Sequence, residues 1–504
     1  MTIVATQRHV LPSRVDVLVV GGGVSGLATA HFLRSRLGTR TSVLVLEADP
    51  RPGGKIWTRN VAGHPVDVGP DAFLARAPEL RSLVADLGLS DQVTGPAATG
   101  AYVWSRGQLR PLPSGAVFGI PDRVVPMLRS GLLSPRGAAR AALDLVRPAT
   151  TPRVADPSVG DLLRPRFGRE VFERLVQPLV GGVHAGDADQ LSASASVPEV
   201  DAMARSGRSL FLTLRARRRA AAAAAMKAVT SQTAGSDGRR APALVSLLGG
   251  MDGLVKALVG ALGDDLLSGV AVVDVAPTPD GLLVNTSRGP VVADQVVLAT
   301  PAWVTADLLA ASNPTAAEVL REIPYVGVAN VTLALPSADV PSPALHGTGF
   351  LVPPVEGELL VGCSWLSSKW PHLVGKDVSL IRSMVGREGD QRWLAMDDDE
   401  LVAEVRESLS RLMGLHSEPV AALVQRWPAA MPQYTVGHAD RLARLDAALA
   451  PSPSLHVTGA AYRGAGLAGC VAQASTVASL VCERLAVLES GAGQPAGPPE
   501  GALR

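Results

Sequence analysis

The sequence predicts an α/β protein with a discontinuous parallel-sheet domain, a helical insertion and a separate antiparallel sheet. Apolar strands run into glycine-rich turns near both ends of the chain, at residues 15–26 and 455–470. Helical patterning dominates residues 124–230 between them. Strand-like segments joined by turns, with no helix between them, fill residues 326–370, and this pattern favours a separate antiparallel sheet.

The first element is an apolar strand that ends in a glycine turn. Residues 15–20 form an apolar, β-branched run of the kind that is buried on both faces of a sheet. The segment after it contains the pattern G-x-G-x-x-G, and residues 27–37 are expected to be helical. In a dinucleotide-binding unit such glycines permit a tight turn, close approach to a pyrophosphate and close packing of helix on strand. The residues expected at the pyrophosphate are Gly21, Gly22, Gly23, Val24, Ser25 and Gly26.

The second strand, residues 42–46, supplies the ribose-binding end of this unit. It ends at Glu47, which stands 21 residues after Gly26 and is followed by Ala48. The Glu47 carboxylate is placed to accept hydrogen bonds from ribose hydroxyls, and its charge would repel a 2′-phosphate. Strand, helix, second strand and terminal acid together predict a Rossmann-like domain with a dinucleotide at the N-terminus of its first helix.

A second glycine turn follows at once, in the segment Arg51-Pro52-Gly53-Gly54-Lys55. This segment resembles the R-x-G-G segment of the flavoprotein family that includes amine oxidases, phytoene desaturases and porphyrinogen oxidases. In that family the segment lies over the pyrophosphate and flavin of FAD. The resemblance therefore implies FAD as the cofactor, with Gly54 and Lys55 among the residues that contact it.

A third turn, Gly69-Pro70-Asp71-Ala72, resembles the turn that lies beside the flavin in the same family. A turn of this composition is otherwise a plain connection. The resemblance implies that these four residues contact the cofactor. Arg76 follows closely and would face the same region, where it could meet a substrate carboxylate; an ordinary surface arginine is the alternative.

The middle of the chain supplies the insertion and the second sheet. Residues 124–146 and 159–183 are expected to be helices, and residues 231–240 a mobile polar loop. Residues 291–300 form a buried strand that returns the chain to the first domain. Val272, which precedes this strand, matches a residue of the flavoprotein family whose backbone caps the adenine side of the cofactor. The alternative is an ordinary core valine.

A last glycine turn, at residues 461–470, lies between a strand, residues 455–460, and a closing helix, residues 471–488. In the flavoproteins that the chain resembles, this helix points its positive end at the flavin pyrimidine, where reduction builds negative charge. The resemblance implies that Ala465, Gly466 and Leu467 lie against the ring.

Residues 426–438 narrow the resemblance, through Arg426-Trp427 and the run MPQYTVGH at residues 431–438. They resemble the segment that precedes the closing strand in the FAD-dependent porphyrinogen oxidases. The resemblance spans residues 15–488 and is greatest to the coproporphyrinogen III oxidases of monoderm bacteria. Supporting stretches are residues 115–121, 178–187, 329–335 and 370–372.

This resemblance implies a position for Trp427 near the FAD and for Val183 and Met384 in the wall of a substrate cavity. Met384 departs from the aromatic residue that some relatives carry there, and Ala77 replaces a basic one. A large, mostly apolar cavity with cations at its rim would suit a macrocycle that carries propionates.

The function implied is the FAD- and O2-dependent oxidation of coproporphyrinogen III to coproporphyrin III, with release of H2O2, in haem biosynthesis. Hydride transfer to a flavin needs no Ser/His/Asp or metal constellation, and the sequence offers none, so no catalytic residue is assigned. Three alternatives stay open: a protoporphyrinogen IX oxidase, a flavin amine oxidase walled by Tyr434 and Tyr462, and a flavin binder without turnover.

Composition excludes other classes. A net charge of +1 and 4% aromatic residues give no footprint for nucleic acid. Cys363, Cys470 and Cys482 form neither a metal pattern nor an even disulfide set, which favours a reducing, cytoplasmic location. No signal peptide and no run of 18 apolar residues is visible, so no membrane span is predicted. Peripheral membrane contact and a later haem-pathway enzyme as partner stay open, and the sequence is silent on oligomeric state.

The expected domain division follows from these elements. Residues 14–105, 244–308 and 425–488 are assigned to the FAD-binding domain and residues 309–424 to the substrate-binding sheet domain. Residues 106–243 are assigned to the helical insertion and residues 489–504 to a disordered tail.

Overall fold

The computed structural model describes residues 11–492 except residues 114–115, 117, 121–122, 147–153, 207–208, 232–241 and 341–345. Most of the expected loop at residues 231–240 and the end of the expected tail, residues 493–504, lie outside the described residues, as do three residues of the 115–121 stretch. The expected tail begins too early, because the closing helix α17 (Leu467–Ala492) continues through residues 489–492.

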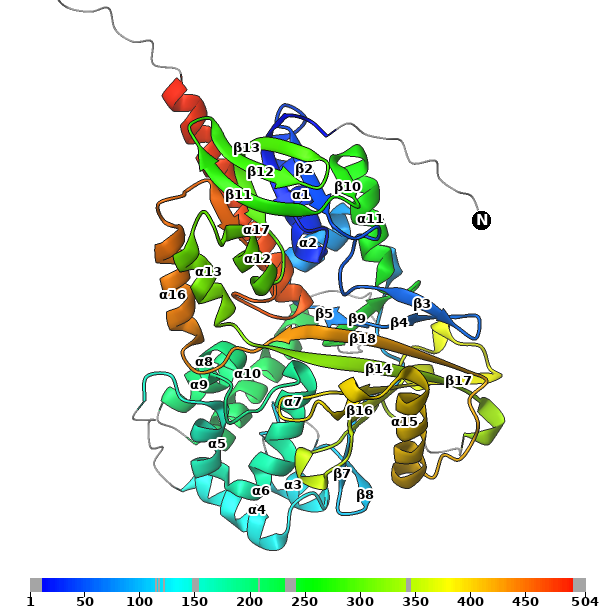
Figure 1. Ribbon diagram of the computed structural model, residues 1–504. Helices are drawn as coiled ribbons and strands as arrows, with labels where there is room; N and C mark the ends of the chain where they lie inside the picture. The colour runs from blue at the N-terminus through cyan, green and yellow to red at the C-terminus, as the bar shows by residue number, and fades with distance from the viewer. Residues whose placement is uncertain are drawn as a thin grey trace, which may run out of the picture.

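The first sheet is assembled from strands scattered along the whole chain (Figure 1). Its parallel part has the order β10-β2-β1-β13-β19, and an antiparallel hairpin, β11 and β12, extends it beyond β13. Parallel strands place their carboxyl ends at one edge, so the turns after β1, β2 and β19 meet there. The strands are β1 (Arg14–Val20), β2 (Val43–Glu47), β10 (Leu266–Ser268), β11 (Val272–Thr278), β12 (Gly281–Thr286), β13 (Gly289–Leu298) and β19 (Leu455–Val457).

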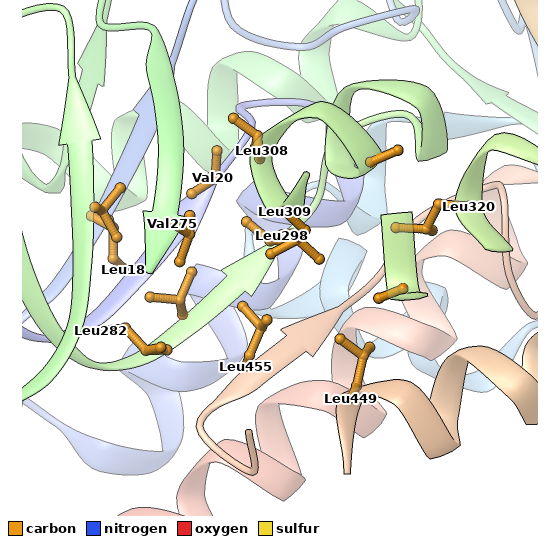
Figure 2. Close-up of a cluster of buried hydrophobic side chains, with 14 of the residues drawn as sticks. Leu18, Val20, Val275, Leu282, Leu298, Leu308, Leu309, Leu320, Leu449 and Leu455 are labelled. Carbon is orange, nitrogen blue, oxygen red and sulfur yellow. The ribbon is translucent and has the colours of Figure 1, made fainter. Parts of the chain in front are cut away.

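Helices cover both faces of this sheet, which explains the long buried apolar runs in β1, β2 and β13. One face packs against α1 (Val24–Leu37), α11 (Asp252–Leu262) and α17. The other packs against α12 (Ala302–Leu309), α13 (Pro314–Arg321) and α16 (His438–Leu449), whose leucines meet Leu18, Val20 and Leu298 in Figure 2.

The second sheet is antiparallel except where β15 meets β7, and it has the order β18-β14-β17-β16-β15-β7-β8. Its long strands cross the middle of the molecule (Figure 1). The antiparallel sheet expected from residues 326–370 is therefore confirmed. Its strands are β7 (Tyr102–Ser105), β8 (Gln108–Pro111), β14 (Tyr325–Pro336), β15 (Gly349–Leu351), β16 (Leu360–Trp365), β17 (Val378–Val385) and β18 (Ala421–Pro432).

Two expected domain boundaries cut through this second sheet. The boundary at residues 105/106 falls inside the β7–β8 hairpin, and the boundary at residues 424/425 falls inside β18. Both errors have one cause: these strands pair with β15 and β14, which are far away in sequence. The local composition of a strand does not indicate which distant strand it pairs with.

The two faces of the second sheet have different surroundings. Alternate residues Ile381 and Val385 of β17 join a core with α15 (Asp398–Met413), whose first turn is closed by a capping box between Asp397 and Glu400. Arg382 and Met384 alternate with them and therefore lie on the opposite face, toward the first domain.

The helical insertion is more broken than the sequence predicts. Instead of one helix over residues 124–146, the chain forms α3 (Val124–Arg129) and α4 (Pro135–Ala142), interrupted at Gly131, which has a φ of 69°. Instead of one helix over residues 159–183, it forms separate segments that break at Gly168. The remaining helices here are α5 (Val159–Phe167), α6 (Arg169–Val171), α7 (Gln177–His184), α8 (Ala193–Ser196), α9 (Pro198–Arg205) and α10 (Leu210–Ser231).

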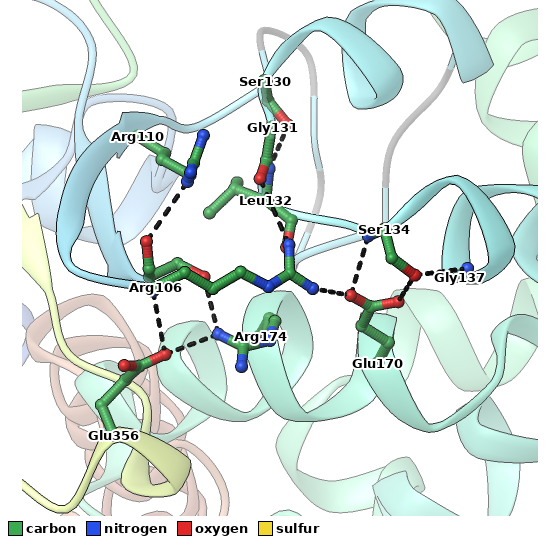
Figure 3. Close-up of polar contacts among 11 residues, drawn as sticks. Arg106, Arg110, Ser130, Gly131, Leu132, Ser134, Gly137, Glu170, Arg174 and Glu356 are labelled. Carbon is green, nitrogen blue, oxygen red and sulfur yellow. Dashed lines mark hydrogen bonds and ion pairs between the residues drawn. The ribbon is translucent and has the colours of Figure 1, made fainter.

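A polar network fastens the insertion to the second sheet (Figure 3). Arg106, in the β7–β8 turn, forms an ion pair with Glu170 of α6. Arg174 donates to Ser105 Oγ at 2.6 Å and pairs with Glu356. The remaining small elements, close to the first domain, are α2 (Pro78–Asp86), β3 (Thr58–Val61), β4 (His64–Asp67), β5 (Phe73–Leu74), β6 (Val93–Thr94) and β9 (Leu244–Leu247).

Candidate active site

The turn between β1 and α1 is held by close backbone packing. A Cβ added at Gly26 would lie 1.9 Å from Gly21 O, and one at Gly21 would lie 3.0 Å from Ala299 O. A Cβ at Gly23, in contrast, would meet no atom within 4 Å. Gly23 is the N-cap of α1 and offers no side-chain cap, so the first amides of the helix are left for an anion. This is the geometry that a dinucleotide pyrophosphate requires.

The second glycine turn lies directly on the first. Gly53 N–H donates to Gly22 O at 2.7 Å, and a Cβ at Gly54 would lie 3.3 Å from Gly23 Cα. Gly53 and Gly54 have φ values of 110° and 56°, a region that favours glycine. Lys55 follows, and burial lowers the pKa of its ammonium. Lys55 is partly buried and lies near Cys470 of the last glycine turn, and in the described part of the chain no carboxylate pairs with it, so its charge is available to an anion.

Glu47, at the end of β2, closes the ribose side of the site. Its Oε2 accepts a hydrogen bond from Gly22 N–H at 2.6 Å, and its Oε1 accepts one from Asp49 N–H at 2.8 Å. Each carboxylate oxygen has a second lone pair, so both can still accept from ribose hydroxyls. Val270 N–H donates to Glu47 O at 2.9 Å, which brings the start of β11 with Val272 to the same end of the site.

The last glycine turn lies against the first one. A Cβ at Gly459 would lie 3.9 Å from Ser25 Oγ, and the Cys470 thiol is close enough to Ser25 to hydrogen-bond to it. Burial raises the pKa of this thiol, which keeps it protonated. A Cβ at Gly466 would meet no atom within 4 Å, so the N-terminus of α17 is also accessible to a ligand. Turns from opposite ends of the chain thus surround one place.

The third turn packs on the second. A Cβ at Gly69 would lie 1.9 Å from Lys55 O, so residues 69–72 press against the segment that carries Lys55. Two side chains of the second sheet hold this turn from the other side: Trp427 Nε1 and Asn330 Nδ2 donate to Val68 O at 3.1 and 2.9 Å. Four turns therefore converge at this end of the first sheet, and a Cβ at Gly23 or Gly466 would meet no atom within 4 Å.

Comparisons with known proteins agree with this arrangement. The model of the family described as flavin containing amine oxidoreductase matches residues 24–482. The chain belongs to this family. It is a flavin-dependent oxidoreductase, and its cofactor is FAD.

Three similar proteins show how far the likeness extends. A coproporphyrinogen III oxidase of Bacillus subtilis (strain 168) is 33% identical over 471 residues, which cover 92% of this chain and 97% of that protein. One from Propionibacterium freudenreichii subsp. freudenreichii is 36% identical, with 92% and 90% covered. The crystal structure of a candidate protoporphyrinogen oxidase from Exiguobacterium sp. 255-15 superposes with a TM-score of 0.80 at 29% identity, covering 94% of this chain and all of that one.

The Asp71 side chain of this flavin-dependent oxidoreductase is directed away from the glycine turns. Its carboxylate pairs with Lys369 at 2.8 Å and Arg382 at 3.4 Å and accepts from Trp370 Nε1 at 3.1 Å. Burial alone would raise the pKa of Asp71, but Arg382 and Lys369 hold it well below its usual range. The carboxylate thus fixes the third turn to the segment of Lys369 and Trp370 and to β17.

Arg382 reaches the same turn through its carbonyls. Its Nη1 donates to Asp67 O and, at 3.2 Å, to Gly69 O. Sequence analysis missed Arg382 and Lys369 because they lie outside every motif, and it gave Asn330 no role although the residue lies in the 329–335 stretch. The one available signal was a charged residue inside the apolar strand β17, and it does not identify a partner 311 positions earlier, at Asp71.

The three expected substrate residues are not all at the flavin. Met384 lies on β17 opposite Asn330, on the face that carries Arg382, and is therefore near the third turn. Val183 lies on α7 and is 55% exposed. Arg76 is exposed after β5, with no hydrogen bond or ion pair to another described residue. Their contact with substrate stays a prediction, as does the contact of each glycine-turn residue with FAD.

Among the described residues, one helix is long and apolar enough to cross a membrane: residues 467–488 of α17. Its side chains Val471, Ala474, Ala478 and Val481 are buried in the core shared with α1. Of the apolar window in this helix, 28% is buried within the protein. Among the described residues, no group of three or more His, Cys, Asp or Glu side chains could hold a metal ion.

Proposed function

We propose that this chain is a coproporphyrinogen III oxidase. It would convert coproporphyrinogen III to coproporphyrin III in haem biosynthesis, with six electrons and six protons passed to three O2 to give three H2O2. The observation that carries the proposal is the extent of the likeness to proteins of that name: at 33% and 36% identity it covers both the glycine turns and the second sheet.

FAD supplies the chemistry by accepting hydride from a meso carbon of the macrocycle. The protein's part is to hold and orient. The four turns fix the cofactor, and the face of the second sheet with Met384 and Asn330 would meet the macrocycle. Aromatisation of the product drives the reaction, so the site needs no paired acid and base among its side chains.

The burial of two tyrosines weighs against the function of an amine oxidase. Tyr434 and Tyr462 are the aromatic residues that could wall a flavin in an amine site, but they are 4% and 1% exposed. The Tyr434 hydroxyl donates to Ala460 O at 2.7 Å, and Tyr462 lies in the core beneath α12. Neither ring is free to face a substrate amine.

Coproporphyrinogen III and protoporphyrinogen IX differ in the number of propionates, because two of them are vinyl groups in the second compound. We assign Arg76 to a propionate because it is an exposed cation without a partner in the described chain, close to the third turn. Val183 and Met384 would border the macrocycle itself. A cytoplasmic location is part of the proposal.

The test is direct oxidation of the two porphyrinogens and an amine. The growth of porphyrin fluorescence from each porphyrinogen is measured with and without enzyme, since both compounds autoxidise. Anaerobic addition of coproporphyrinogen III should bleach the flavin, and benzylamine should not. Bleaching by the amine but not by either porphyrinogen would end the proposal.

Substrate preference is tested with Arg76→Gln. Loss of one propionate contact should raise KM for coproporphyrinogen III by about tenfold, with little change for protoporphyrinogen IX. Arg81→Gln, on the exposed side of α2, is the control. Equal KM values for the wild type and Arg76→Gln would remove Arg76 from the substrate site.

A further inference from the structure

Two consecutive side chains, Gln433 and Tyr434, connect the substrate side of the molecule with the flavin side. They follow β18 inside the 431–438 segment and are 3% and 4% exposed. Their backbone is fixed on both sides: Gln433 N–H donates to Pro324 O, and Tyr434 O accepts from Ser192 N–H, each at 2.8 Å. The side chains then reach different parts of the site.

Tyr434 holds the loop that leads into α17. Its hydroxyl donates to Ala460 O at 2.7 Å and accepts from Gly464 N–H at 2.9 Å, so one oxygen joins both ends of the loop. Burial raises the pKa of Tyr434 far above its ordinary value, so this oxygen keeps its proton. Gly464 is two residues before Gly466, where the flavin-facing helix terminus begins.

His438 holds the tyrosine ring in place. The two rings are stacked, with centroids 4.0 Å apart and planes inclined by 13°. His438 Nε2 lies 2.9 Å from Tyr462 O, and because a carbonyl can only accept, Nε2 is the protonated nitrogen of this imidazole. The ring, its stacking partner and the loop thus form one rigid unit.

Gln433 holds the end of α7 instead. Its Nε2 donates to His184 O at 2.9 Å, and a Cβ at Gly186 would come within 2.3 Å of its Oε1. Ala185 between them has a left-handed φ of 52°, and its carbonyl accepts from Glu388 N–H at 2.7 Å. The position of Val183, one residue before the held carbonyl, therefore depends on Gln433.

We propose that Gln433 and Tyr434 are paired positioning residues that set the distance between the substrate wall and the flavin. Tyr434 positions the loop before α17 and thereby the helix dipole at the flavin pyrimidine. Gln433 positions the exit of α7. The second role rests on the proposed function, because it assumes that Val183 borders the substrate.

Tyr434→Phe tests the flavin side. Loss of the two hydrogen bonds that the hydroxyl makes, each of ordinary strength, should speed hydrogen exchange in residues 460–466 by at least about fivefold. The flavin reduction potential should shift to a more negative value, because a looser helix terminus stabilises the reduced ring less. In turnover, kcat should fall while KM stays constant.

Tyr325→Phe is the matched control. The Tyr325 hydroxyl likewise accepts a backbone N–H, from Ala302 at 2.9 Å, but among the described residues it makes no hydrogen bond to residues 460–466. This variant should keep the wild-type potential and the wild-type exchange in residues 460–466. Wild-type exchange and potential in Tyr434→Phe would overturn its role.

Gln433→Met tests the substrate side with a side chain of similar length. His184 O loses its donor, so exchange in residues 180–186 should rise about fivefold or more and KM for coproporphyrinogen III should rise severalfold. The flavin spectrum and potential should not change. Gln295→Met is the control, because Gln295 is equally buried and bonds to Ser454 and His456 at the far side of the first sheet.

These measurements separate the two proposals. Hydrogen exchange and the flavin potential need no porphyrinogen, so they report on positioning alone. If the wild type oxidises no porphyrinogen while both variants loosen their segments, the proposed function falls and the positioning role stands. If Gln433→Met leaves residues 180–186 as in the wild type, or lowers kcat without raising KM, the role of Gln433 is overturned.

Discussion

The turn between β1 and α1 is held in shape mainly by backbone packing, with the Glu47 carboxylate on Gly22 N–H, whereas the turn before α17 is held by the side chains of Tyr434 and of Gln473 in α17. In the first, Gly26 packs on Gly21 O, and no side chain caps the helix. In the second, the Tyr434 hydroxyl accepts from the Gly464 amide, and Gln473 Nε2 donates to the Gly464 carbonyl. A largely self-supporting turn would suit the invariant part of a cofactor, while a turn supported from outside can be adjusted to a particular reaction.

The third turn, at residues 69–72, is held in a further way, by buried charge. Asp71 meets Lys369 and Arg382 from the second sheet and its edge, so the cofactor half and the substrate half share an ion-pair network. Substitutions in the three turns should therefore have different consequences: loss of cofactor, loss of stability or altered chemistry.

The largest effect is expected from Gly26→Ala. The new Cβ would lie 1.9 Å from a backbone oxygen, which cannot move without opening the turn. FAD content, measured as visible flavin absorbance relative to protein, should fall to a trace. Gly260→Ala is the control, since a Cβ there meets no atom within 4 Å and the site is a helix interior where alanine is favoured over glycine. Normal FAD content in Gly26→Ala would contradict the self-supporting turn.

Asp71→Ala should cause the largest loss of stability that leaves the glycine turns intact. It leaves Lys369 and Arg382, whose side chains are 12% and 11% exposed, without their ion-pair partner, which should lower the free energy of unfolding by about 3–5 kcal/mol. Denaturant unfolding of the FAD-loaded protein measures this. Asp307→Ala removes an exposed pair with Arg321 and should cost less than about 1 kcal/mol. Similar losses for the two variants would show that the Asp71 network is no stronger than a surface pair.

Asp67→Asn should remove the pH dependence that Asp67 contributes to the free energy of unfolding. Burial raises the pKa of Asp67 to about 6, while hydrogen bonds from Thr58 and Met251 N–H act against that rise. Because the folded pKa is above the unfolded one, stability from protonated Asp67 is present below about pH 4 and lost as pH rises through 6.

Asparagine does not titrate and keeps an acceptor oxygen for the same donors. Between pH 4 and pH 8 the free energy of unfolding of the variant should therefore rise, relative to that of the wild type, by at most about 3 kcal/mol. Unfolding free energies measured across this range check the prediction. A constant difference between the two proteins at every pH would assign the effect to something other than Asp67 ionisation.

The sequence predicts the parts of the site whose contacts are local and does not predict the parts whose contacts join distant segments. The first strand, its glycine turn and Glu47 are local, because spacing alone encodes the backbone contacts that they make. Arg382 and Gln433 are not local: their partners, Asp71 and His184, come from other parts of the chain, and nothing near either residue indicates them. The two long helices predicted in the insertion were wrong for a third reason: glycines with positive φ, such as Gly131 and Gly168, interrupt an otherwise helical pattern.

The smallest effect is expected from Glu47→Gln. The two carboxylate oxygens of Glu47 accept hydrogen bonds separately, from Gly22 N–H at 2.6 Å and from Asp49 N–H at 2.8 Å. A glutamine side chain has only one acceptor oxygen for these two donors. The ribose would also lose a charged acceptor. FAD affinity, measured by quenching of flavin fluorescence, should weaken by about fivefold to tenfold, which corresponds to about 1 kcal/mol. Glu318→Gln, at an exposed position of α13, is the control and should bind FAD like the wild type. Unchanged affinity in Glu47→Gln would mean that the grip on FAD comes from the glycine backbone alone, with the acid only shaping the turn.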